Sequence, residues 1–229
     1  MKTSRRSWLT STFLACALGW CVTSPAGLHA ADSAAPKYAT IDEAIARGDA
    51  ADVTLHLRRN PALVRGGPDV KLLPLHQAIL RRQAKIVALL LEQGADVQAP
   101  DAAGRSPLHM AVERGDATIV RELLQRKADV NKGDRAGWTA LHHAAAKSKT
   151  DLATLLLDAG AKPNVLSQLG GTALHEAAAA GSVEVAKLLL ARGVDASIRS
   201  KPGVTALDLA REYKHAEMVT LLEGVAAKR

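Results

Sequence analysis

The sequence predicts an all-α protein built from stacked copies of one short helical unit. Hydrophobic residues make up 48% of the 229 residues, but aromatic residues make up only 3%. Because β-sheet cores draw on aromatic and β-branched side chains, this Ala- and Leu-rich composition favours packed helices. The second observation is a set of histidines that recur every 33 residues, which indicates a repeat array. They are His76, His109, His142 and His175.

The first thirty residues predict a secretory signal peptide that is not part of the fold. Residues 1–30 contain a basic start with Arg5 and Arg6, an apolar stretch over 8–22 and small residues before Ala30. This order is typical of a signal that is cleaved after export. A retained membrane anchor is the alternative, although the apolar stretch is short and interrupted. The paired arginines resemble a twin-arginine signal, so that route and the general secretory route both stay open.

Removal of the signal changes the charge and the chemistry of the chain. The whole chain carries 30 Lys+Arg against 23 Asp+Glu, a net charge of +7. Residues 1–30 hold three basic residues and no acidic one, so the mature chain carries 27 against 23, or +4. Cys16 and Cys21 also leave with the signal, so no thiol is left for a disulfide or a metal. We expect a periplasmic or secreted protein whose residues 31–37 form a flexible linker.

The same sequence motif recurs every 33 residues. A short segment ending in Leu-His or Leu-Asp opens a unit, an alanine follows two residues later, and a leucine-rich stretch comes next. The opening segments are residues 73–76, 106–109, 139–142, 172–175 and 205–208. The unit boundaries that this phase predicts are 71–103, 104–136, 137–169, 170–202 and 203–229, preceded by a degenerate unit at 38–70.

This pattern resembles the ankyrin repeat, in which each 33-residue unit has a β-turn followed by two helices. The resemblance covers residues 71–222 in five units, and the degenerate unit begins near Thr40. It implies an ankyrin-repeat solenoid of five to six units over residues 38–229. It also implies a protein–protein interaction module that presents a rigid concave surface to a partner. We expect a monomer, because polar end units cap such an array.

Local signals explain how a unit begins and ends. A serine or threonine stands at the predicted N-cap of a first helix, and Pro107 follows where its missing N–H costs nothing. Glycine ends the second helices in a left-handed conformation, and Lys127 replaces it in one unit, which should cost about 1 kcal/mol. The N-cap residues are Ser106, Thr139, Thr172 and Thr205, and the helix-ending glycines are Gly94, Gly160 and Gly193.

The phased histidines are tempting as a metal site, but their spacing argues against one. Adjacent units stack about 10 Å apart, whereas zinc needs nitrogens about 2.1 Å from one ion. We therefore expect each histidine to tie its turn to the neighbouring one by a hydrogen bond, as the resemblance implies. The chain also lacks a P-loop, a nucleophile elbow and a dinucleotide fingerprint. We predict no metal, no cofactor and no enzymatic activity, with an unrecognised active site as the alternative.

One aromatic residue stands out at a turn tip. Trp138 is the only tryptophan outside residues 1–30, and tryptophan is enriched at interaction hot spots. The phase places Arg105, Arg135, Arg114 and Lys147 in the same or adjacent units. Together these five residues predict a basic patch with an aromatic centre that binds the acidic surface of a partner protein. The alternative is a tryptophan that packs on the neighbouring tip among solvated charges.

Other partner classes fit the sequence less well. The modest net charge, the absence of a Lys/Arg run and the scarcity of aromatic residues predict no nucleic-acid binding. No membrane contact is expected after signal cleavage. Two alternatives to a simple interaction module stay open: a regulator or stabiliser of a periplasmic enzyme, and a secreted effector or toxin-neutralising protein.

Overall fold

The computed structural model describes residues 35–66 and 72–227. The predicted signal peptide and residues 31–34 of the predicted linker lie outside these ranges. The folded unit begins at Pro36. Lys37, the last residue of the predicted linker, belongs to it, because its backbone N–H donates a hydrogen bond to the carboxylate of Asp52. The predicted linker is therefore too long at its C-terminal end.

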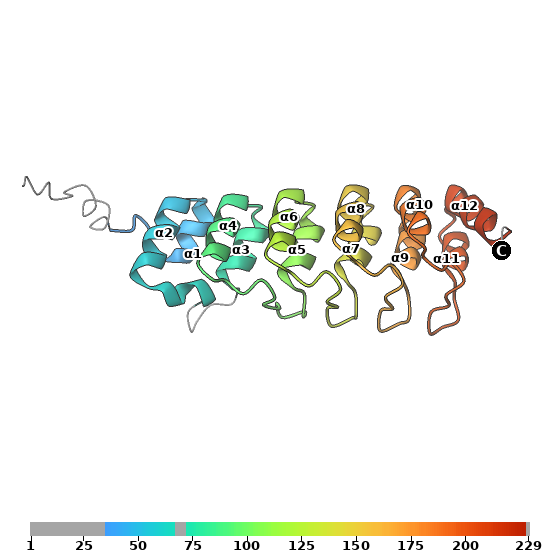
Figure 1. Ribbon diagram of the computed structural model, residues 1–229, viewed down its shortest axis with the longest axis horizontal. Coiled ribbons are helices and arrows are strands. Elements are labelled where there is room, and N and C mark those ends of the chain that lie inside the picture. Colours follow the sequence, from blue (N-terminus) through green and yellow to red (C-terminus); the bar gives the residue numbers. More distant parts are fainter. Residues whose placement is uncertain (1–34, 67–71, 228–229) are drawn as a thin grey trace, which may run out of the picture. The chain divides into compact units, whose positions relative to one another are not determined.

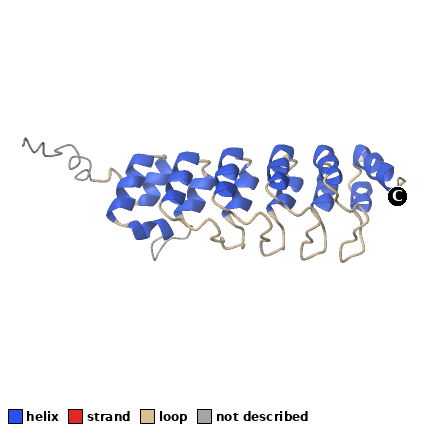
Figure 2. Ribbon diagram, in the orientation of Figure 1, coloured by secondary structure: helices blue, strands red, loops and turns tan. Residues whose placement is uncertain are grey.

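The part of the chain that the structure describes is all-α, as predicted (Figure 2). It contains twelve α-helices in six pairs and one 3₁₀-helix, η1, that follows the first pair; it has no strand. The pairs are α1 (Ile41–Arg47) with α2 (Ala50–Arg59), α3 (Pro74–Leu80) with α4 (Ala84–Glu92), α5 (Pro107–Arg114) with α6 (Ala117–Gln125), α7 (Ala140–Ala146) with α8 (Thr150–Asp158), α9 (Ala173–Ala180) with α10 (Val183–Ala191), and α11 (Ala206–Glu212) with α12 (Ala216–Ala226). The 3₁₀-helix η1 spans Pro61–Arg65, and no sequence signal predicted it.

The helix pairs stack in chain order, so each pair contacts only its neighbours along the array (Figure 1). First helices pack on first helices, from α1 through α3, α5, α7 and α9 to α11, and second helices pack in the same order. In the described residues the array therefore has six units, the upper end of the predicted range. The degenerate first unit is a genuine helix pair that packs against the second.

The core repeats with the same 33-residue phase as the sequence. In the four central units, one leucine of the first helix and one of the second helix are almost fully buried, which stabilises each of these units by about 1.5–3 kcal/mol per side chain. In the four central units these are Leu75, Leu108, Leu141 and Leu174 of the first helices and Leu90, Leu123, Leu156 and Leu189 of the second helices. Because each of these residues packs within and between units, no unit buries its core alone.

Left-handed residues end the second helices where the sequence predicted them, and they also end the first helices. Gly94, Gly160 and Gly193 have φ of 86°, 91° and 82°, and Lys127 takes the same conformation with φ of 64°. The first helices also end in left-handed residues, which the sequence reasoning did not anticipate. These are Gly48, Arg82, Gly115, Ser148, Gly181 and Lys214.

Backbone hydrogen bonds join the turn tips of neighbouring units. The N–H of Arg135 donates to the carbonyl of Ala103 at 3.2 Å, and the N–H of Gln168 donates to that of Ala136 at 2.8 Å. Glycine is needed at this contact, because a Cβ on Gly137 would lie 2.8 Å from the nitrogen of Gln168. The predicted turns thus form a continuous edge along one side of the array (Figure 2).

Candidate interaction surface

The phased histidines form the scaffold that fixes the first helices and the turns. Nδ1 of His109 accepts a hydrogen bond from the backbone N–H of Ser106 at 3.0 Å, and Nε2 lies 2.9 Å from the carbonyl oxygen of Trp138. Because a backbone N–H only donates and a carbonyl only accepts, the ring is neutral with its proton on Nε2. His142 and His175 make the same tie to the following unit, to Gly171 at 3.3 Å and to Val204 at 3.2 Å, whereas His76 bonds to Ala99 of its own unit at 2.8 Å.

These bonds confirm the tie between neighbouring units that the sequence predicted for His109, His142 and His175, whereas His76 makes a hydrogen bond within its own unit. Burial lowers the pKa of each of them, and it lowers the pKa of His142 to about 4. Both nitrogens of His109, His142 and His175 are occupied, so neither has a lone pair for an ion. Among residues 35–66 and 72–227, no three metal-ligating side chains converge on one point.

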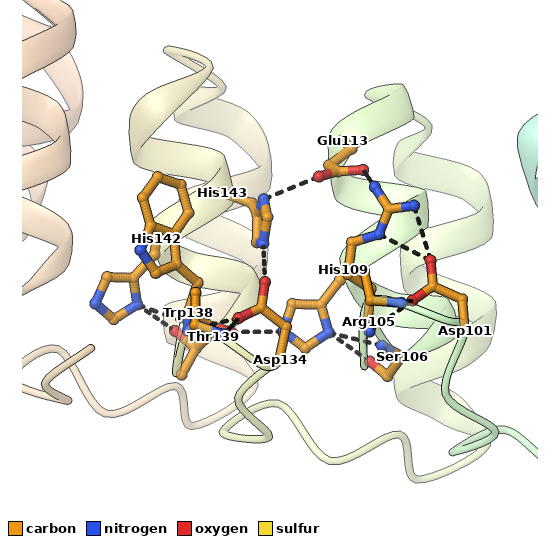
Figure 3. A network of polar contacts seen from close by, with 12 residues as sticks. Asp101, Arg105, Ser106, His109, Glu113, Asp134, Trp138, Thr139, His142 and His143 are labelled. Carbon is orange, nitrogen blue, oxygen red and sulfur yellow. Dashed lines mark hydrogen bonds and ion pairs between the residues drawn. The ribbon is translucent and has the colours of Figure 1, made fainter. Parts of the chain in front are cut away.

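Trp138 is half-buried and its side chain is held in place by its own unit. The indole stacks on His142, with ring centroids 6.2 Å apart and 26° between the planes, and it meets His143 edge-on at 5.2 Å (Figure 3). Its backbone N–H donates to Oδ1 of Asp134 at 3.0 Å. Trp138 therefore packs on helix α7 and presents its remaining surface in a fixed orientation.

A polar network beneath Trp138 joins units three and four. Nδ1 of His143 lies 3.1 Å from Oε1 of Glu113 on α5, and Nε2 lies 3.2 Å from Oδ2 of Asp134 (Figure 3). A carboxylate only accepts hydrogen bonds, so the doubly protonated imidazolium is the form of His143 that satisfies both contacts. Burial alone would raise the pKa of Asp134, but hydrogen bonds from Trp138 and His143 hold that pKa below its ordinary value.

Arg105, one of the five predicted binding residues, extends this network and does not face solvent freely. Its guanidinium lies 2.7 Å from Oδ2 of Asp101 and 2.7 Å from Oε2 of Glu113, and 32% of the side chain is exposed. Two carboxylates therefore compensate its charge. Arg105 braces the turn against α5, and the basic character predicted for this position is neutralised.

The other three predicted cations are exposed. Arg135 lies at a turn tip, where its side chain packs over Gly104: a methyl group on that glycine would lie 2.9 Å from Cγ of Arg135. Arg114 is the last residue of α5, and Lys147 is the C-cap of α7. The structure thus places Trp138 and Arg135 with the turns and places Arg114 and Lys147 at the ends of the first helices.

Sequence reasoning missed the acidic and imidazole side chains of this surface. Asp101 and Asp134 are 33 residues apart, and Ser167 and Ser200 continue the series. Each aspartate carboxylate accepts backbone N–H groups within its own turn. The recurrence of a polar residue every 33 positions could have identified both aspartates as turn-forming residues. Nothing in the sequence indicated that Glu113 would bridge Arg105 and His143, because the bridge crosses two units.

A further carboxyl group lies on the first helix of the next unit. Glu176 on α9 occupies the same phase as His143, and its Oε1 would lie 3.7 Å from a Cβ on Gly171. Burial raises the pKa of Glu176 to about 7. Within the described ranges no cation pairs with this carboxyl group, so the surface beside Trp138 also contains an acid that is easily protonated.

Comparison with known proteins settles the family. A model of ankyrin repeats, in three copies, matches residues 75–167 and 152–227, which together exceed half of the chain. The protein belongs to the ankyrin repeat family. This confirms the family that the sequence pattern predicted. A search of curated proteins found no match. Ankyrin repeat domains are general protein–protein interaction modules and are typically non-enzymatic.

The ankyrin array extends beyond the residues that the family model matches. Helices α1 and α2 precede residue 75, yet they pack on α3 and α4 in the same way as the later pairs pack on one another. Among residues 35–66 and 72–227, none of the helices has the length and apolar composition needed to cross a bilayer. The turn tips and the exposed ends of the first helices form the candidate interaction surface.

Proposed function

We propose that this ankyrin repeat protein binds a partner protein in the periplasm, or outside the cell, through a surface centred on Trp138. The observation that carries the proposal is the fixed, half-exposed indole: two ring contacts and one backbone hydrogen bond hold Trp138 on α7. A tryptophan held in this way offers a large apolar area that is already ordered before binding. Little side-chain entropy is then lost on association.

The surrounding charges support a partner with an acidic surface. Arg135 is exposed at the same turn as Trp138, and Arg114 and Lys147 are exposed at the ends of α5 and α7. Export through the signal at residues 1–30 would bring this surface to a partner outside the cytoplasm. We propose that the protein acts there as a monomer, because the six units already stack on one another within a single chain.

Affinity capture tests this function. The protein is expressed from its full sequence, purified from its own compartment, and the co-purified proteins are identified by mass spectrometry. We expect Trp138→Ala and Arg135→Glu each to reduce capture of one partner by about tenfold. Lys201→Glu is the matched control, since Lys201 is an exposed cation at the equivalent tip two units away. Circular dichroism checks that each variant is folded.

The outcome separates the candidate roles. If both variants capture the partner as well as the wild type does, the surface around Trp138 is not the binding site. If the captured protein is an enzyme, its activity with and without the ankyrin repeat protein shows whether binding regulates it. A partner of foreign origin would instead favour the secreted effector or toxin-neutralising role.

A further inference from the structure

A row of exposed cations runs along the ends of the first helices. In each of the first four units the residue that precedes the left-handed helix end is basic and exposed. This cationic row consists of Arg47, Arg81, Arg114 and Lys147. The fifth and sixth units have Ala180 and Tyr213 at the same place, so the row ends after helix α7. Only two of its members belong to the patch that the sequence predicted.

No acidic side chain neutralises the cationic row. Within residues 35–66 and 72–227, its four members form no ion pair. Two carboxylates that follow members of the row in the sequence are already engaged: Asp49 accepts the N–H of Asp52, and Asp116 caps α6 and pairs with Arg82 at 3.5 Å. Glu113, beside Arg114, pairs with Arg105 and His143. The positive charge of the row is therefore available to a ligand.

A neighbouring lysine makes the same edge more basic. Lys149 stands at the N-cap of α8, where the first and third units have Asp49 and Asp116. A positive charge at a helix N-terminus opposes the helix dipole, so helix stability does not favour a lysine there. Lys149 is exposed and packs beside Gly115, with Nζ 3.5 Å from where a Cβ on that glycine would lie.

Helix stability alone does not explain the cationic row. A cation in the last turn of a helix interacts favourably with the helix dipole, by about 0.3–1 kcal/mol. However, α9 has no basic residue in its last turn and forms the same helix without that contribution, and in α11 Arg211 supplies it while Tyr213 occupies the position of the row. Lys149 lies at the opposite, unfavourable helix end. A shared interaction with an anionic ligand accounts for both placements.

We propose that the cationic row binds an extended acidic segment of the partner protein. Successive units, and so successive cations, lie about 10 Å apart, and a chain in the extended polyproline II conformation advances about 3.1 Å per residue with three residues per turn, which puts every third side chain on the same side. Every third residue of such a segment therefore meets one cation, and a segment with acidic residues at this spacing fits the row. The inference rests on the proposed function and adds the charge and conformation of the partner's contacting element.

Two synthetic peptides test the spacing. Both are fluorescently labelled, contain about twelve residues and have the same composition of glutamate, serine and glycine. One has glutamate at every third position, and the other has its glutamates in one block. Fluorescence anisotropy at low salt should show binding of the spaced peptide that is about fivefold tighter, and added salt should weaken it. Equal affinities would overturn the proposal.

Matched charge reversals test the location. The row variant Arg114→Glu/Lys147→Glu should weaken binding of the spaced peptide about tenfold. The control Arg121→Glu/Lys162→Glu makes the same change in net charge at exposed residues outside the row and should leave affinity within about twofold. Equal losses in the two variants would show that only net charge matters, which overturns the proposal.

A gain-of-binding variant keeps the test independent of any loss of folding. Ala180→Lys adds a fifth cation in phase with the row, so a longer peptide with five spaced glutamates should bind about threefold tighter than it binds the wild type. A single-stranded oligonucleotide of similar length is the competing ligand. If it binds as tightly as the spaced peptide, the row is a general polyanion site and the proposal is wrong.

Partner capture distinguishes failure of this inference from failure of the proposed function. If the row variant captures the partner normally while Trp138→Ala does not, the function stands and the row is not the contact for the partner. If the row variant no longer captures the partner while Trp138→Ala still does, the cationic row is a contact for the partner and the surface around the indole is not. Loss in both variants supports one continuous interface.

Discussion

At the scale of single residues, the left-handed positions show where this repeat tolerates strain. Each unit needs such a residue at the end of its first helix, and glycine adopts that conformation without a steric penalty. Arg82, Lys127, Ser148 and Lys214 adopt it with side chains, with φ between 53° and 64°. Each of these residues costs about 1 kcal/mol relative to glycine. The array accepts these costs because stacking fixes the helix ends on both sides.

Replacement of Lys127 by glycine should stabilise the protein. The variant Lys127→Gly relieves the strained backbone at the end of α6 and should raise the free energy of unfolding by about 1 kcal/mol. Urea denaturation measures this change. Gly160→Lys, at the equivalent end of α8, is the reciprocal control and should lower the free energy of unfolding by a similar amount. A loss of stability in Lys127→Gly would mean that its side chain makes a compensating contact.

The sequence predicted the residue roles that follow from position within the repeat unit. It did not predict the roles that depend on contacts with side chains elsewhere in the chain. The strain at Lys127 and the hydrogen bonds of His109 and its equivalents follow from position within a unit, so they were predictable. The pairing of Arg105 with Glu113 was not, because it depends on rotamers and on the distance between two elements. For the same reason the predicted basic patch includes a cation that carboxylates neutralise.

At the scale of elements, α7 and α9 pack closely because alanines face each other across their contact. Ala144, Ala145, Ala177 and Ala178 have no exposed surface. Small side chains let the helices approach, and this leaves little water around a polar group that lies between them and the turn. Glu176 lies beside this contact, which explains why burial raises the pKa of its carboxyl group to about 7.

Removal of the charge at Glu176 should stabilise the protein at neutral and alkaline pH but not at acidic pH. The folded state raises the pKa of this acid from 4.5 to about 7, so its contribution to stability is complete below the unfolded value and is lost as pH rises to about 7. Because Glu176 is partly exposed, solvent screening reduces the full linkage energy of this shift, and Glu176→Gln should be more stable than the wild type by at least about 1 kcal/mol near pH 8 and equally stable near pH 4. Urea denaturation at the two pH values checks this.

An exposed acid serves as the control for that experiment. Glu212→Gln removes a carboxylate from the exposed end of α11 and should change stability little at either pH. A gain in stability for Glu176→Gln that is equal at both pH values would contradict the assignment, because it would show a packing effect and not a titration.

At the scale of the whole molecule, buried histidines make the array sensitive to acid. All four histidine ties use a neutral ring, and burial holds the pKa of each ring below its ordinary value. Stability from such groups is complete above the unfolded pKa of 6.5 and is lost as pH falls towards the folded value, which is about 4 for His142. Protonation of Nδ1 also removes the acceptor of a cap hydrogen bond.

The variant His142→Gln should flatten this pH dependence. At pH 7 it should lose about 1–3 kcal/mol, because a buried tie between the fourth and fifth units is removed. Between about pH 6.5 and pH 4 it should lose less additional stability than the wild type, because one titrating ring is absent. Urea denaturation across this range gives the change in the free energy of unfolding with pH for the variant and for the wild type. Glu176 is present in both proteins, so its opposite contribution cancels in the comparison. Parallel slopes would show that His142 does not titrate with unfolding.

The extent of the array was largely predictable, because the number of units follows from the 33-residue repeat, which is visible in the sequence. The helical nature of the first unit could be predicted from Thr40 and Glu43, whose cap hydrogen bond the structure contains. Helix η1 and the attachment of Lys37 to Asp52 could not. Both lie at the end of the array, where no second copy of the pattern shows which contacts replace a missing neighbour.

The histidine ties have one more consequence, which concerns how such a chain changes its length. Every ring donates to a main-chain carbonyl, and the residues that supply it across a unit boundary are as different as Trp138, Gly171 and Val204. An acceptor that belongs to the peptide bond is present whatever side chain stands there. A duplicated or deleted 33-residue segment would therefore rejoin its neighbours without a compensating substitution, and recombination within the gene would yield longer or shorter arrays that still fold.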